Sequence, residues 1–372
     1  MNIIFHPLEV KDKQDKAFIT KLSLQDDGSF YCSLAFAEDL LLRIEPNKKG
    51  SEIKSIEKLP IRKVFGDDSV AITGGLQKTT SGDSAFAVLH KGSMPSALNS
   101  LFGKKWPHLD ALNFNDFLMD NSGGMGFSLR HSIGQIQKGE LQVRRSHEGG
   151  ALVDVLLIGD NLFGLSGSEI WREPYLNTEK RYSLRADLLP NGQIHRDADD
   201  NFWLLGRENK LFRLKTHDIK AKPTFKKIAG PSFLLSVASS TDGWLYGVSG
   251  NQKTIFRIRL NKVTQEEEIQ TLAEMDNPVT SLCAADLNHG PFLMAATSNM
   301  EKTTLWRWDL KAEEDPEKLV QPPEGRVFEE LPNLNWVQHL QLRQISESQY
   351  QFWCSVAQKD DNRPCLASFT LD

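Results

Sequence analysis

The sequence predicts an all-β protein assembled from repeated units of short antiparallel strands. Three observations support this prediction: one strand motif recurs along the chain, a polar turn precedes each copy, and the copies are nearly evenly spaced. The composition agrees, because 372 residues with 40% hydrophobic and 25% charged residues are typical of a globular protein with a sizeable core.

The recurring motif is an aliphatic residue, a bulky apolar residue and an arginine. An apolar stretch and a polar turn, usually of Asp, Asn or Gly, precede each copy, and most copies have a further apolar stretch upstream of that turn. Such stretches joined by such turns are typical of a β-meander, since Asp, Asn and Gly adopt the backbone angles of tight turns. The five copies are residues 41–44, 170–172, 211–214, 255–258 and 305–308.

The spacing of the copies predicts how many there are. The first gap between motif arginines is 129 residues, which is three times 43, whereas the later gaps are 41, 44 and 50. We therefore expect two degenerate copies in the first gap, near 84–89 and 126–130, and an eighth copy of three strands over 336–371. The motif arginines are Arg43, Arg172, Arg213, Arg257 and Arg307.

Four-stranded units of about 40–50 residues are the blades of β-propellers, which pack face to face around a channel. We predict a single closed β-propeller of eight four-stranded blades over residues 1–372. Seven blades is the alternative, if the two degenerate copies form one blade with an insertion. Because the last copy has only three strands, we expect Asn2–Leu8 to supply its outer strand and close the ring.

One copy has a more specific resemblance. Residues 279–310 resemble a WD repeat, because the Trp308-Asp309 pair ends the third strand. The dipeptide occurs in this copy alone. The whole chain therefore resembles WD-repeat proteins in its propeller pattern, but only this copy resembles a WD repeat in sequence. The resemblance implies a platform for protein interactions.

An insertion at 93–112 interrupts the strand pattern. Pro95 suits a first helical turn, and the following apolar residues fall on one face at helical spacing, which predicts a short helix near 94–106. This Ser-rich segment resembles the lipid-packing helices of membrane-coat propellers, including scaffold nucleoporins. Its apolar face either packs on the core or contacts a protein partner or, weakly, a membrane. The predicted partner-binding residues are Met94, Leu98, Leu101, Phe102 and Trp106.

The segment 197–208 has the ligand spacing of a calcium loop. Its oxygen donors Asp197, Asp199, Asn201 and Glu208 fall at positions one, three, five and twelve. Phe202, however, occupies the position where such a loop needs glycine. The repeat explains the segment as well, because its Asp-Asn pair aligns with the turns of other copies. We predict a blade turn with no metal and no cofactor, and a calcium site is the alternative.

The repeated arginine has two interpretations. In a third strand, its aliphatic stem can lie along the packed surface while the guanidinium reaches a carboxylate or carbonyl. Alternatively, a ring of arginines binds a polyanionic ligand in the channel. We expect the structural role.

Charge and cysteine content indicate where the protein acts. A net charge of −5 and a pI near 6.0 argue against nucleic-acid binding, which needs clustered positive charge. Four cysteines without a C-x-x-C motif fit a reducing compartment. No signal-peptide pattern and no apolar run of membrane-spanning length is present. We expect a cytoplasmic or nuclear-envelope-associated protein that is not secreted.

These features predict a non-enzymatic interaction scaffold, a propeller subunit that binds other protein subunits of a larger assembly such as a nuclear-pore or membrane-coat scaffold. One alternative is a propeller enzyme of the metal-dependent lactonase or hydrolase type, whose acidic ligands come from separate blades. Another is a glycan-binding propeller, which needs repeated aromatic residues in equivalent loops. We place the relevant tryptophans in strands instead; they are Trp171, Trp203, Trp244, Trp306 and Trp308.

Overall fold

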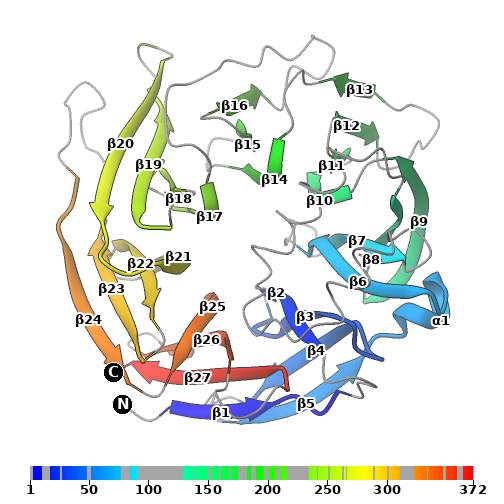
Figure 1. The fold of residues 1–372 in the computed structure, drawn as a ribbon, viewed down its shortest axis with the longest axis horizontal. Helices are drawn as coiled ribbons and strands as arrows, with labels where there is room; N and C mark the ends of the chain where they lie inside the picture. Colours follow the sequence, from blue (N-terminus) through cyan, green and yellow to red (C-terminus); the bar gives the residue numbers. More distant parts are fainter. Residues whose placement is uncertain are drawn as a thin grey trace. The chain divides into compact units, whose positions relative to one another are not determined.

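The computed structural model consists almost entirely of antiparallel β-sheets (Figure 1). No helix in the described part of the chain is long and apolar enough to cross a membrane. The structure describes residues 3–10, 17–25, 27–47, 52–76, 84–90, 129–137, 139–149, 152–158, 161–166, 169–174, 182–185, 190–196, 201–206, 210–215, 234–240, 242–249, 252–261, 264, 266–287, 290–299, 301–310, 322–332, 334–346, 349–357 and 363–371.

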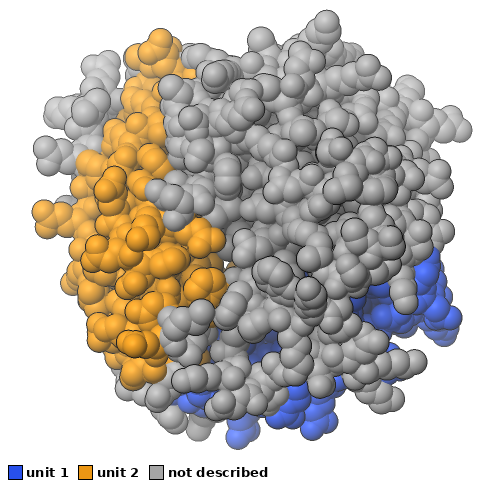
Figure 2. Space-filling view, viewed as in Figure 1, with its two compact units in different colours: residues 1–194, 343–372 blue, residues 195–342 orange. Residues whose placement is uncertain are grey.

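The chain divides into two compact units, shown in blue and orange in Figure 2. Unit 1 comprises residues 1–194 and 343–372, and unit 2 comprises residues 195–342. Within the described residues, strands that follow one another in sequence pair with one another, which gives seven groups of three or four strands. A meander repeated in this way is what the recurring turns and apolar stretches predict.

Two groups of unit 1 form one eight-stranded sheet. The pairing of Ala35 with Ala71 joins the two groups into one sheet, and the short helix α1 (Ile61–Phe65) connects them in sequence. The strands of the first group are β2 (Phe18–Leu24), β3 (Phe30–Ala35), β4 (Leu41–Pro46) and β5 (Ile53–Lys58). Those of the second are β6 (Ser69–Gly75), β7 (Ser84–His90), β8 (Leu129–Gln137) and β9 (Glu140–Gly149).

The expectation that residues 84–89 and 126–130 belong to two separate copies does not agree with the described strand pairing. Strand β7 pairs directly with β8, with Ser84 opposite Ile136 and Leu89 opposite His131, so residues 84–89 and 129–130 lie in one group. An apolar stretch marks a strand but not its pairing partner, which is why the spacing alone does not separate one copy from two in this region. The pairing matches the alternative in which one blade contains an insertion.

A third group of unit 1 begins at residue 152, and a fourth joins the two ends of the chain. In the fourth, β1 (Ile3–Pro7) pairs with β27, with Ile3 opposite Phe369 and Pro7 opposite Cys365. The third group is β10 (Leu152–Ile158), β11 (Asn161–Ser166), β12 (Glu169–Pro174) and β13 (Tyr182–Arg185). The fourth has the order β1, β27 (Cys365–Leu371), β26 (Tyr350–Ala357) and β25 (Asn335–Gln344).

Burial, hydrogen bonds and ring stacking hold β1 and the residue after it against the neighbouring strands. Leu8 is 1% exposed, and its backbone N–H donates to the Pro364 carbonyl at 2.9 Å. The His6 ring stacks on Trp353 with centroids 4.9 Å apart, and its Nε2 lies 2.9 Å from Ser368 Oγ. Burial lowers the pKa of His6, and the charge of Glu52 offsets this only in part.

The remaining groups lie mainly in unit 2, although β14, like β25 of the group above, spans the sequence boundary between the units. One is β14 (Pro190–Arg196), β15 (Asn201–Gly206) and β16 (Lys210–Lys215). The next is β17 (Leu234–Ser239), β18 (Leu245–Ser249), β19 (Thr254–Leu260) and β20 (Glu267–Glu274). The last is β21 (Val279–Leu287), β22 (Gly290–Ser298), β23 (Thr303–Asp309) and β24 (Gly325–Leu331).

Adjacent groups within each unit share apolar clusters, because each sheet is apolar on faces that it cannot bury alone. In unit 2 one cluster joins β17–β20 to β21–β24, and it includes Trp244, Tyr246, Leu293 and Trp308. In unit 1 one cluster joins Tyr31 and Leu41 of the first group to Phe86 and Val88 of the second. The described core is therefore a series of sheet-to-sheet interfaces.

Candidate functional site

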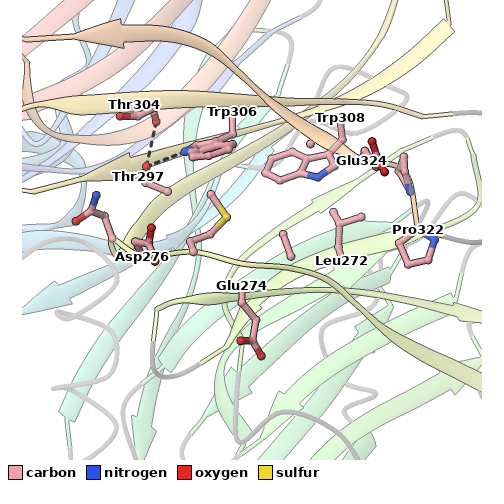
Figure 3. Close-up of a pocket in the computed structure, with 14 residues that line it drawn as sticks. Leu272, Glu274, Asp276, Thr297, Thr304, Trp306, Trp308, Pro322 and Glu324 are labelled. Carbon is pink, nitrogen blue, oxygen red and sulfur yellow. Dashed lines mark hydrogen bonds between the residues drawn. The ribbon is translucent and has the colours of Figure 1, made fainter.

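A groove in unit 2 is the candidate functional site (Figure 3). Its volume is about 520 Å³, within the range of ligand pockets. It lies where the end of β20 meets the faces of β22 and β23 and the chain entering β24. Its lining residues are Leu272, Ala273, Glu274, Met275, Asp276, Asn277, Thr297, Thr304, Trp306, Trp308, Pro322, Pro323, Glu324 and Gly325.

Strand periodicity places two indole rings in the groove. Trp306 and Trp308 are two residues apart on β23, so their side chains leave the same face of the strand. Small residues lie opposite them: Ala295 pairs with Trp306, and Gly325 pairs with Trp308. A Cβ atom at Gly325 would overlap the Trp308 indole, so glycine is required for this close packing.

Hydrogen bonds fix the Trp306 ring. The indole Nε1 donates to Thr297 Oγ1 at 3.1 Å, and this hydroxyl donates in turn to the Thr304 carbonyl at 3.3 Å (Figure 3). A buried indole N–H needs such a partner, because an unpaired donor costs about 1–3 kcal/mol. The ring is partly exposed, so its free surface faces the groove in a defined orientation.

The opposite wall comes from β20 and the turn after it. Leu272 and Met275 are mostly buried and contribute apolar side chains. The turn is held to the start of β19, because the Met275 N–H donates to the Lys253 carbonyl at 2.8 Å. This wall is therefore braced by backbone contacts rather than by side chains alone.

The groove carries negative charge at its edges. Its lining includes Glu274, Asp276 and Glu324 but no Lys or Arg. Two basic residues in this region are already paired: Lys302, just before β23, with Glu330 at 2.6 Å, and Arg326 of β24 with Asp309 at 3.0 Å. Within the described part of the chain, the three carboxylates form no ion pair. The site can attract a cation and cover an apolar group, and its described residues hold no cluster of His, Cys or carboxylates suited to a metal ion.

The repeated arginines have the structural role expected for them wherever their side chains are described. Arg43 donates to Asp27 at 2.6 Å, and Arg307 donates to Asp309 at 2.6 Å and lies over the Phe292 ring. Arg257 is 3% exposed, donates to Gln270 at 2.7 Å and lies 4.2 Å from the Trp244 ring centroid. Each therefore packs on its own sheet. The side chains of Arg172 and Arg213 are not described.

A hydrogen-bonded chain in unit 1 has the residue types of a hydrolase triad. His90 Nε2 lies 2.7 Å from Ser132 Oγ, and His90 Nδ1 lies 3.1 Å from Asp68 Oδ1. The exposed end is Asp68, whose side chain is 40% accessible, whereas Ser132 is 6% exposed. A nucleophile must reach its substrate, and here the serine is buried while the aspartate is exposed. The three residues therefore fit a structural role, in which they link β7, β8 and the turn before β6 by hydrogen bonds.

The residues predicted as a partner-binding surface, Met94, Leu98, Leu101, Phe102 and Trp106, lie outside the described residues, as does the whole insertion at 93–112. The same holds for half of the calcium-type loop, including Asp197, Asp199 and Glu208. Asn201 is the first residue of β15, so the strand expected after that turn is present.

No family model matches the chain, and no curated protein matches it. Among solved structures it is similar to the extracellular domain of a candidate hybrid two-component system from B. thetaiotaomicron, with 12% identity and a TM-score of 0.55, covering 98% of this chain and 39% of that one. It is also similar to BBS1N, a propeller solved in complex with ARL6DN, with 10% identity and a TM-score of 0.53, covering 99% and 97%. The chain has a β-propeller-like fold.

In this propeller-like fold, the groove is a feature that sequence analysis did not identify. The sequence pattern places Trp306 and Trp308 in a strand and assigns them no binding role. Their i, i+2 spacing was a signal, since it puts two indoles on one face. The opposite wall of the groove, the end of β20, lies about 30 residues earlier in the sequence. Only the packing of two sheets brings it close to the two tryptophans.

Proposed function

We propose that this protein is a non-enzymatic interaction scaffold, a β-propeller subunit that binds other proteins in a larger assembly. The groove of unit 2 is the observation that carries the proposal. It offers an apolar floor and carboxylates that form no ion pair with a described residue, on a frame of hydrogen-bonded sheets, and such preformed surfaces bind partners at low entropic cost. Among similar structures, BBS1N was solved as a complex with ARL6DN, so one chain of this fold holds a partner.

The proposed propeller is a closed ring of seven blades. Each strand group described above is one blade, and β1 is the outer strand of the blade that contains β25 to β27. A closed ring leaves no blade without a neighbour for its apolar faces. The proposal includes an intracellular location, cytoplasmic or at the nuclear envelope. It is supported by four buried cysteines, which are Cys32, Cys283, Cys354 and Cys365.

The test is recovery of the native complex. The tagged protein, expressed at its native level, is purified from its own cell and passed through gel filtration, and its neighbours are identified by cross-linking mass spectrometry. We expect at least one protein partner in stoichiometric amount that survives nuclease treatment. Recovery of a monomer alone, or of a complex that nuclease dissolves, would contradict the proposal.

A nuclear-pore or membrane-coat assembly is the specific form of this proposal, and it depends on the insertion. Leu101→Ser with Phe102→Ser should remove a partner or membrane contact without changing the melting temperature. Asn99→Ala with Ser100→Ala changes the polar face of the same segment and is the matched control. If the first pair of changes unfolds the protein, the segment belongs to the core. If both variants keep the same partners, this form of the proposal fails.

A further inference from the structure

We infer that the groove of unit 2 binds an extended protein segment in which a basic side chain lies next to a bulky apolar one. This inference rests on the proposed function, because it names the kind of partner that the scaffold holds. Its basis is the combination, in one place, of indole surface, fixed walls and carboxylates that pair with no described basic residue.

The apolar part of the ligand follows from the floor and walls. Trp306 presents a partly exposed ring whose orientation Thr297 fixes, and Met275 lines the same space. Pro322 and Pro323 form another wall, and proline has a restricted backbone, so this wall is semi-rigid. A bulky apolar side chain that enters the groove replaces water on surfaces that lose little freedom.

The basic part follows from the carboxylates. In the view of Figure 3, Asp276 and Glu324 lie on opposite sides of the two tryptophans, whereas Glu274 points away from them. Both Asp276 and Glu324 are exposed, and no described basic residue pairs with either. A Lys or Arg of the ligand can therefore contact a carboxylate and the face of an indole together, which are two favourable interactions for one cation.

The neighbouring segment of the chain is a poor occupant for this groove. Residues 311–321 connect β23 to β24 and carry two basic and four acidic residues, a net charge of −2. Like charges repel, so the charge of this segment complements Asp276 and Glu324 less well than the charge of a basic ligand does. The acidic residues are Glu313, Glu314, Asp315 and Glu317, and the basic ones are Lys311 and Lys318.

The size of the groove favours a segment over a domain face. About 520 Å³ holds a few side chains, which is the volume that short extended motifs place in a groove. Binding of this kind is modest in strength and depends on salt, since exposed charge pairs are screened.

The experiment uses the full-length protein and three short fluorescein-labelled peptides. One alternates arginine and leucine, the second alternates glutamate and leucine, and the third alternates arginine and serine. Fluorescence anisotropy should show that the arginine–leucine peptide binds at least about tenfold more tightly than the other two, and that added salt weakens it. In protein labelled with 5-fluorotryptophan, this peptide should shift the fluorine resonance of Trp306, identified by its loss in Trp306→Phe, and leave that of the buried Trp203 unchanged.

Charge variants locate the site. Asp276→Asn with Glu324→Gln should weaken binding of the arginine–leucine peptide about threefold to tenfold, as expected for two exposed charge pairs. Glu266→Gln with Glu301→Gln removes two exposed carboxylates of unit 2 outside the groove, and we expect no change. Equal weakening by both pairs would show a general effect of net charge and would overturn the inference.

Other results would overturn it as well. These are equal binding of the glutamate–leucine or arginine–serine peptide, no binding of any peptide, or an unshifted Trp306 resonance. Replacement of 311–321 by a Gly-Ser linker should leave affinity nearly unchanged. Binding that appears only after this replacement would show that the chain's own segment occupies the groove.

If native partners still co-purify with the Asp276→Asn, Glu324→Gln variant, the scaffold proposal stands and this inference alone fails.

Discussion

Two Asp-Gly turns, one in each unit, have the same local structure and different surroundings. Gly28 and Gly243 have φ values of 77° and 85°, and in each turn the Asp side chain accepts a backbone N–H two residues on. The local sequence predicts this geometry, because Asp favours such a turn and glycine alone adopts positive φ without strain. What the sequence does not indicate is the distant residue beside Gly28, which is Arg343.

A pair of alanine substitutions separates these local and distant effects. Gly243→Ala should cost about 1 kcal/mol of unfolding free energy from backbone strain, since nothing lies within 4 Å of its Cβ position. Gly28→Ala should cost more, because its Cβ would lie 2.8 Å from Arg343 Nε. Urea denaturation measures both.

The same pair in an Arg343→Met background provides the control. There the two alanine substitutions should have nearly equal costs, since the crowding guanidinium is gone. A difference that persists in this background would show that Arg343 is not its cause.

The strand β1 shows how one side chain can make the pairing of a whole element depend on pH. His6 is buried against Trp353 and Ser368, and burial lowers its pKa below the ordinary value near 6.5. The unfolded chain therefore binds more protons than the folded chain just below pH 6.5. The unfolding free energy should fall as the pH falls through this range.

Comparison of the wild type with His6→Gln isolates this contribution. Other groups also titrate between pH 5 and pH 7.5, but they are shared by both proteins. We expect the wild-type unfolding free energy to fall more steeply than that of the variant as the pH decreases. Parallel curves from urea denaturation would show that His6 does not control the stability of β1.

Removal of the whole strand tests its pairing with β27. Deletion of residues 1–10 should lower the melting temperature by several degrees, because it removes Leu8 from the core and exposes the edge of β27. A synthetic peptide of residues 1–10, added in excess, should restore part of the loss, since it binds only the folded state. A scrambled peptide is the control, and an unchanged melting curve after deletion would contradict the pairing.

At the scale of the whole molecule, the repeat could be predicted where short sequence motifs define it. The prediction failed where it depended on which strands, far apart in the sequence, pair with one another. The turns and the third-strand arginines follow from short motifs, as Arg43, Arg257 and Arg307 show. The pairing of β7 with β8 does not, because a long insertion separates them and apolar alternation is the same for any partner. The groove depends on the packing of two sheets, which no local pattern encodes.

Replacement of residues 91–128 by a short Gly-Ser turn tests the blade count and the role of the insertion together. Leu89 lies opposite His131 in adjacent antiparallel strands, so a short turn can close the connection with less loop entropy. With seven blades, the shortened protein should fold, and calorimetry should give a melting temperature within about 2 °C of the wild type if the removed segment does not pack on the core. With eight blades, the deletion would remove strands and the protein would unfold.

The same shortened protein tests whether the insertion binds a partner. If it is stable and loses a native partner in the affinity purification, the insertion binds that partner. If it keeps every partner, binding occurs elsewhere on the propeller.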